Sequence, residues 1–186
     1  MYWLMSSALL ALTLVSRVPA QPTSDACRSQ IPEGLGQALQ RHFPERRLPS
    51  VSDSSSEDVQ SDRTGGGDGC LLVQRDDFDG DGRKDIAAGL PPRAGRAPVV
   101  AVALKRDRGW AISTIRAWVD DISRLYVASA PPGIHRRTVA LDRPLSPNER
   151  KSLRCDHVAV VVGAIESTAI AYCYVHGRWL YVWVSD

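Results

Sequence analysis

Residues 70–90, with the sequence CLLVQRDDFDGDGRKDIAAGL, contain two short apolar runs separated by an acidic turn that includes glycine. Residues 70–74 and 85–90 each have the length and the apolar composition of a strand, and Asp and Gly cluster between them. Strand-like runs with this punctuation are typical of antiparallel neighbours. The segment therefore predicts the beginning of a β-meander.

The turn carries carboxylates at its positions 1, 3, 5 and 9, namely Asp77, Asp79, Asp81 and Asp85. Calcium takes about six to eight oxygen ligands, which alternate side chains of a tightly curled loop can supply. The backbone carbonyl of Arg83, at position 7, adds a ligand, and Gly82 allows the sharp turn at position 6. We therefore predict Ca²⁺ as the cofactor. The alternative is a solvated acidic turn without an ion.

The loop differs from that of a helix–loop–helix EF-hand. Position 12 is Ala88 rather than Glu, and the flanking segments are predicted to be strands. Magnesium suits the loop less well than calcium, because Mg²⁺ keeps several of its waters and favours few protein carboxylates.

Residues 76–87, DDFDGDGRKDIA, resemble the loop of the FG-GAP (integrin propeller-like) repeats, which links the first two strands of a blade. The resemblance extends over residues 70–118. It implies a blade-like unit whose calcium ligands are Asp77, Asp79, Asp81, the Arg83 carbonyl and Asp85. A propeller has several such loops, whereas this chain has one and shows no internal repeat. We therefore expect a single unit rather than a full propeller.

Short apolar runs punctuated by Gly, Pro and Asp continue to the C-terminus. They predict further strands over residues 98–105, 110–118, 126–130 and 138–141, and a second meander over residues 157–165, 168–175 and 179–184. The sequence Ser146-Pro147-Asn148-Glu149 has the pattern of a capping box and predicts a short helix toward Leu153.

The segment before residue 70 has a different composition. Residues 31–43 carry an apolar side chain at every fourth position, which predicts a short helix. Residues 49–69 are rich in Ser, Asp and Gly and predict a flexible linker. We thus expect an N-terminal segment with a short helix (21–48), this linker (49–69) and a β-rich calcium-binding domain (70–186). The predicted fold class is mainly β (α+β), with antiparallel meanders and two short helices.

The composition is that of an ordinary globular protein. The 186 residues include 23 Lys and Arg against 21 Asp and Glu, and 44% are hydrophobic. The near balance of charge argues against a strongly basic nucleic-acid-binding protein. The length suits one domain.

Residues 1–20 have the pattern of a signal peptide. The apolar run at 6–15 is too short to span a bilayer, and Val18-Pro19-Ala20 fits the small-residue preference of a cleavage site. We expect cleavage after Ala20 and a periplasmic or secreted mature chain. The alternative is a buried N-terminal helix or a retained anchor.

Four cysteines remain in the mature chain: Cys27, Cys70, Cys155 and Cys173. An even number in an exported protein indicates two disulfides, with three possible connectivities. Cys155 and Cys173 flank apolar runs that resemble neighbouring strands, so our working hypothesis pairs them and joins Cys27 to Cys70. A zinc site is disfavoured because no C-x-x-C pair is present.

Aromatic residues recur at every second position in the last two predicted strands: Tyr172, Tyr174, Trp179, Tyr181 and Trp183. Such a face can stack on sugar rings or contact a protein. The alternate residues 180, 182 and 184 are also apolar, which favours burial on both sides. Core and binding face both remain open.

The sequence shows no catalytic motif of the zinc-hydrolase or G-x-S-x-G type. We therefore expect a calcium-stabilised binding protein rather than an enzyme. By analogy with small β proteins of bacterial envelopes, the specific hypothesis is a periplasmic inhibitor or immunity factor that blocks a cell-wall hydrolase. The expected partner is thus another protein, not nucleic acid or a membrane. The alternatives are a carbohydrate-binding or adhesion module that uses the aromatic face, and a small secreted hydrolase.

Overall fold

The first four strands form an antiparallel meander in the order β1-β2-β3-β4. They are β1 (Val73–Asp76), β2 (Asp85–Leu90), β3 (Val99–Arg106) and β4 (Gly109–Ala117). Every residue of β2 and the middle five of β3 are buried, so this sheet is covered on both faces.

The computed structural model describes residues 25–94 and 97–185, and the predicted signal peptide with its cleavage after Ala20 lies outside them.

A second antiparallel sheet has the strand order β10-β9-β8-β5. It consists of β5 (Leu125–Ala130), β8 (Ala159–Ala164), β9 (Ala169–Val175) and β10 (Arg178–Ser185). The chain turns between β9 and β10 at His176 and Gly177, both with positive φ. The mainly β, antiparallel fold class is thus confirmed, and the bounds of these strands differ from the predicted ones by at most three residues.

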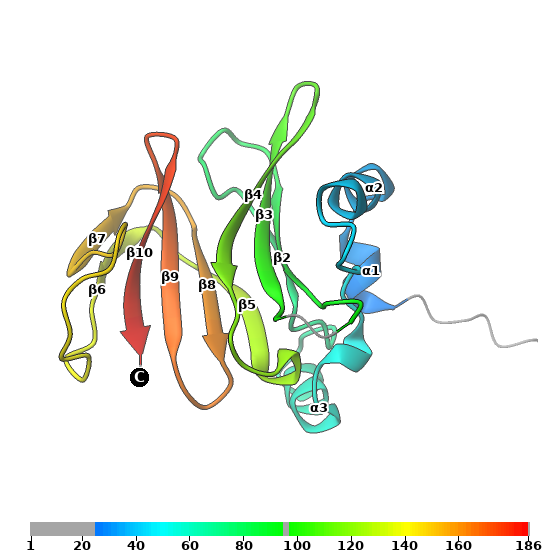
Figure 1. The fold of residues 1–186 in the computed structure, drawn as a ribbon, viewed down its shortest axis with the longest axis horizontal. Coiled ribbons are helices and arrows are strands. Elements are labelled where there is room, and N and C mark those ends of the chain that lie inside the picture. Colours follow the sequence, from blue (N-terminus) through cyan, green and yellow to red (C-terminus); the bar gives the residue numbers. More distant parts are fainter. Residues whose placement is uncertain (1–24, 95–96, 186) are drawn as a thin grey trace, which may run out of the picture.

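One face of the second sheet packs on the first sheet (Figure 1). Val100 and Val102 of β3 share a hydrophobic cluster with Val160 and Val162 of β8. The approach is close beside Gly89, where a Cβ would lie 2.7 Å from a Leu125 methyl carbon. The small residues of the predicted run 85–90 therefore make room for the facing sheet.

A third, two-stranded sheet covers the outer face of the second. It is formed by β6 (Gly133–Arg136) and β7 (Ser152–Cys155), which lie next to β10 in Figure 1. Leu153 packs there with Leu180 and Val182 in a separate cluster. Cys155 of β7 is bonded to Cys173 of β9, with 5.6 Å between their Cα atoms.

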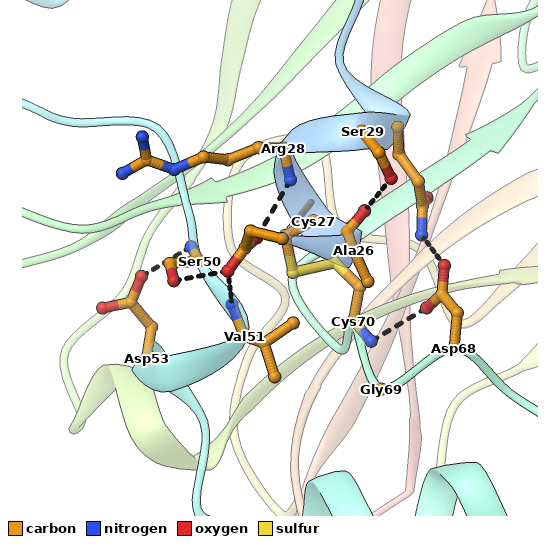
Figure 2. The surroundings of a disulfide bond; sticks show 12 residues. Ala26, Cys27, Arg28, Ser29, Ser50, Val51, Asp53, Asp68, Gly69 and Cys70 are labelled. Atoms are coloured by element: carbon orange, nitrogen blue, oxygen red, sulfur yellow. Dashed lines mark hydrogen bonds between the residues drawn. A yellow bond between two sulfur atoms is a disulfide. The ribbon is translucent and has the colours of Figure 1, made fainter. Parts of the chain in front are cut away.

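Helices cover the other side of the first sheet (Figure 1). They are α1 (Ala26–Gln30) and α2 (Glu33–His42), and α2 buries Leu35 and Leu39. The helix predicted over residues 31–43 is therefore confirmed. Cys27 of α1 is bonded to Cys70, with 4.9 Å between the Cα atoms, beside Ser50 and Val51 (Figure 2).

Both disulfides of the working hypothesis are thus present. Two disulfides suggest an oxidising compartment outside the cytosol. Within the described ranges, no helix combines the length and the apolar character needed to cross a membrane.

The flexible linker predicted over residues 49–69 is wrong. This segment forms the 3-10 helix η1 (Val51–Asp53) and the helix α3 (Ser56–Thr64). The Ser50 side chain caps η1, and Ser55 Oγ accepts a hydrogen bond from the Asp58 N–H at the start of α3. Ser and Asp therefore act here as helix caps rather than as signs of disorder. Val59, which is buried, anchors α3.

The helix predicted from Ser146 toward Leu153 is also absent. Glu149 does reach back to the Ser146 N–H, at 3.0 Å, as in a capping box. Asn148, however, has a φ of 65°, which stops a right-handed helix. The chain instead forms a turn and continues as β7. The strand predicted over residues 138–141 is likewise wrong, since the preceding β6 ends at Arg136.

Candidate metal centre

The acidic loop connects β1 to β2. Asp76, the last residue of β1, pairs with Asp85, the first residue of β2. The loop curls around the carboxylate of Asp77. Asp77 Oδ1 accepts from the N–H of Gly80 at 2.8 Å and of Asp81 at 3.1 Å, and Oδ2 accepts from the Gly82 N–H at 2.9 Å. Gly80 and Gly82 both have a left-handed φ, near +80°. The backbone thus turns its amides inward around position 1.

Phe78 and Asp85 fix the base of the loop. The Phe78 ring is fully buried in the main hydrophobic cluster. Asp85 is also fully buried, and its carboxylate accepts from the Phe78 N–H at 2.9 Å and from the Lys105 N–H at 2.7 Å. The loop is therefore attached to both β2 and β3.

Three of the four predicted carboxylate ligands lie together. One oxygen each of Asp77, Asp79 and Asp85 lies within 4.8 Å of the others, an arrangement that could hold a metal ion. Asp81 is placed differently, since its Oδ1 accepts from the Arg83 N–H at 2.9 Å. Asp81 and the Arg83 carbonyl remain predicted ligands. The all-oxygen, carboxylate-rich donor set fits a hard cation.

The electrostatics of the cluster favour a bound cation. The pKa of Asp85 is raised to about 6: burial is the main cause, the negative charges of Asp79 and Asp81 act in the same direction, and the two backbone N–H donors oppose it. In this structure, Arg106 Nη1 lies 2.6 Å from Asp79 Oδ2 and 3.3 Å from Asp81 Oδ2. One guanidinium therefore offsets part of the negative charge.

Two side chains from distant parts of the sequence also lie beside this loop. Arg106 belongs to β3 and reaches it across the sheet. His157 precedes β8, and its ring lies so close to Gly80 that a Cβ on that glycine would be 2.0 Å from the imidazole Cε1. Both contacts join residues more than twenty positions apart, so local sequence patterns cannot predict them.

The aromatic residues of β9 and β10 share the face that packs on the first sheet. Tyr172 pairs with Tyr181, and Tyr174 with Trp179, across the two strands. Tyr172 is 2% exposed, whereas the other four aromatic side chains are partly buried against the same cluster. The Trp179 indole N–H donates to Ser113 Oγ of β4 at 3.1 Å. This face therefore contributes to the contact between the sheets.

No family model, curated protein or solved structure matches this chain.

Proposed function

We propose that this chain is an exported, calcium-stabilised binding protein that acts by contact with another protein. Its specific form would be a periplasmic inhibitor or immunity factor that blocks a cell-wall hydrolase. The proposal has a structural part, the calcium loop, and an interaction part, a basic surface with exposed apolar side chains.

The calcium part is supported by the geometry around Asp77. The Gly82 N–H already bonds to the position-1 carboxylate, so little rearrangement is needed to direct the remaining oxygens at an ion. Calcium would supply the charge that keeps Asp77, Asp79 and Asp85 together. The loop joins the first two strands of a four-stranded meander, and on this basis we propose a single FG-GAP-like unit over residues 70–118.

The observation that carries the interaction part is the surface of residues 133–155, which we call the basic hairpin. Three of the four large hydrophobic side chains found exposed in the described ranges belong to it: Ile134 at 53%, Val139 at 99% and Leu145 at 42%. The same segment contains six Lys and Arg against two carboxylates, although the whole chain has a net charge of only +2. Exposed apolar groups among cations suit an acidic protein surface.

The register of the hairpin shows which side chains point outward. His135 pairs with the buried Leu153, so the adjacent pair of Ile134 and Arg154 lies on the opposite, outer face. Arg136, paired with Ser152, lies on that outer face too. An apolar side chain is thus flanked by two cations on a sheet that the Cys155–Cys173 bond ties to β9. Such a surface is largely preorganised for binding.

The connecting loop of the hairpin is held by Glu149. This carboxylate is buried and lies 3.0 Å from Arg137 Nε and 2.7 Å from Arg143 Nη1. The neighbouring backbone bonds to β10, where the Arg150 N–H donates to the Tyr181 carbonyl at 2.8 Å. The loop that exposes Val139 and Leu145 is therefore attached to the main sandwich.

The test is an inhibition assay with a panel of purified cell-wall hydrolases and the oxidised chain. We expect saturable inhibition of at least one hydrolase at an equimolar ratio. Val139→Asp should weaken the inhibition about tenfold or more, because a charge would be buried at the contact. Val119→Asp is the matched control, since Val119 is 89% exposed but lies outside the hairpin.

Two outcomes would contradict the proposal. Absence of inhibition together with binding to insoluble peptidoglycan that Trp183→Ala abolishes would favour the carbohydrate-binding alternative. Equal effects of Val139→Asp and Val119→Asp would remove the basic hairpin from the interface.

A further inference from the structure

A concave site lies between the first sheet and the beginning of α2. It is a cavity of about 460 Å³, and its lining includes Arg75, Lys84, Lys105 and Trp110. Among the described residues that line it there is no carboxylate. Three cations, one of them Lys84 of the acidic loop, and an aromatic ring thus border one hollow.

The sheet register explains why these side chains meet. Arg75 of β1 pairs with Ile86, and Ile86 pairs with Ala103 of β3. Lys105, two residues after Ala103, therefore lies on the same face as Arg75. Since neighbouring strands are about 4.8 Å apart, β1 and β3 are separated by about 10 Å, a span that long basic side chains can bridge around a small ligand.

The cations are only partly neutralised by their neighbours. Lys84 Nζ lies 3.0 Å from Asp76 Oδ1. Lys105 Nζ lies 4.5 Å from the centre of the Trp110 ring, a contact that positions the ammonium but leaves its charge in place. Arg75 is exposed, and no acceptor contacts its guanidinium within the described part of the chain. The hollow therefore retains an excess of positive charge.

The start of α2 borders the same hollow. Its N-cap residue is Pro32, which provides no side-chain cap. The N–H groups of Leu35 and Gly36 donate to the Pro32 carbonyl. The N–H of Gly34, a residue that lines the cavity, has no hydrogen-bond partner among the described residues. No atom lies within 4 Å of the position that a Cβ would take at Gly34, so this side of the helix start is open.

We propose that this cavity binds a phosphate monoester, with the oxyanion between Arg75, Lys105 and the Gly34 N–H and its organic group against Trp110. A monoester dianion offers three terminal oxygens, which suits donors that converge from three elements better than a carboxylate does. The half-buried indole gives a flat apolar wall beside the charge. The groups that would contact the oxyanion belong neither to the calcium loop nor to the basic hairpin.

The experiment titrates the ¹⁵N-labelled, oxidised chain with phenyl phosphate and follows the amide shifts. We expect saturable shifts at Gly34, Leu35 and Lys105, and quenching of tryptophan fluorescence. Arg75→Ala should weaken binding about tenfold, the loss of one hydrogen-bonded charge. Arg178→Ala is the matched control, because Arg178 is an exposed arginine on β10, remote from the cavity. Its binding should equal that of the unmodified chain.

A parallel arm uses vesicles of phosphatidylcholine with and without phosphatidic acid, whose headgroup is a phosphate monoester. Binding to phenyl phosphate assigns the site to a soluble ligand. Binding only to the phosphatidic acid vesicles, sensitive to Arg75→Ala, assigns it to a lipid headgroup. Absence of both, shifts that map away from Gly34, or equal weakening by Arg75→Ala and Arg178→Ala would overturn the proposal.

Discussion

Arg106 Nη1 lies 2.6 Å from Oδ2 of Asp79, a carboxylate that is only 5% exposed. The guanidinium belongs to β3 and the carboxylate to the loop between β1 and β2, so this ion pair attaches the loop to β3. Arg106 thus supplies part of the positive charge that the acidic cluster needs. A bound calcium ion would share Asp79 with it.

The contribution of calcium can be measured at Asp79. Asp79→Asn keeps the shape of the side chain but removes one anionic ligand. We expect it to lower the free energy of unfolding by about 2–3 kcal/mol more in millimolar Ca²⁺ than in EDTA, the stabilisation given by an ion at about a hundred times its Kd. Thermal melts in the two buffers provide the measurement.

Asp142→Asn is the control for that substitution, because Asp142 is exposed and lies in the basic hairpin, outside the cluster. It should behave alike in both buffers. If Asp79→Asn lowers the free energy of unfolding equally with and without calcium, no calcium ion bound at this loop stabilises the protein.

Arg106→Gln should separate the two sources of positive charge. Without calcium, the variant leaves the nearly buried Asp79 carboxylate uncompensated, and we expect a lower Tm than for the unmodified chain. Calcium should then raise the Tm by more than it does in the unmodified chain, since no guanidinium competes for the oxygen. Arg108→Gln, an exposed change in the neighbouring turn, should alter neither value. A smaller calcium effect in Arg106→Gln would show that the arginine assists the ion instead.

Gly80 and Gly82 have similar φ values, +77° and +83°, but different surroundings. Gly82→Ala should cost about 1–2 kcal/mol for the left-handed backbone alone. Gly80→Ala should cost more, because its Cβ would also overlap the His157 ring, whereas no atom lies within 4 Å at Gly82. His157→Ala should reduce the cost of Gly80→Ala toward that of Gly82→Ala. Urea denaturation of the four variants tests this, and an unchanged cost in the double variant would contradict the contact.

Local patterns in the sequence predicted the strands well. The runs at 85–90 and 168–175 fold as β2 and β9 with almost the expected bounds, because alternation and strand length are properties of the segment itself. The acidic loop was also predictable, since the positions of its carboxylates follow a regular spacing. Three of its four carboxylates meet in the structure.

Composition and local motifs mislead where tertiary contacts decide the local structure. The Ser- and Asp-rich segment 49–69 provides the caps of η1 and α3, and the buried Val59 then holds the short helix on the domain. At 146–149 the capping motif formed, but two arginines from the same hairpin took up the Glu149 carboxylate. Partners such as Arg137 and Arg106 are set by tertiary structure and cannot be found from spacing.

The disulfides should differ in their effect on stability. Cys155–Cys173 closes a separation of 18 residues and Cys27–Cys70 one of 43. Replacing each pair by serine should therefore cost about 3 and about 4 kcal/mol respectively, if the main effect is on the unfolded chain. Urea unfolding of both double variants gives the values. A larger loss for the Cys155–Cys173 pair would mean that this bond also holds the β6–β7 sheet in place.

The pH dependence of stability should show the network around Glu149. Burial alone would raise the pKa of this carboxyl, but the Ser146 N–H, Arg143 and Arg137 hold it below its ordinary value of 4.5. The pKa is thus lower in the folded than in the unfolded chain. Its contribution to stability is present above about pH 4.5 and is lost as the pH falls through the folded-state value.

Glu149→Gln tests this directly, because the amide keeps the volume but leaves two arginines without their counter-charge. We expect a loss of about 3 kcal/mol at pH 7, and a difference from the unmodified chain that narrows below pH 4.5. Asp142→Asn, an exposed change in the same loop, should show little loss at either pH. A difference between Glu149→Gln and the unmodified chain that stays constant from pH 7 to pH 3 would show that packing, not charge, carries the effect of Glu149.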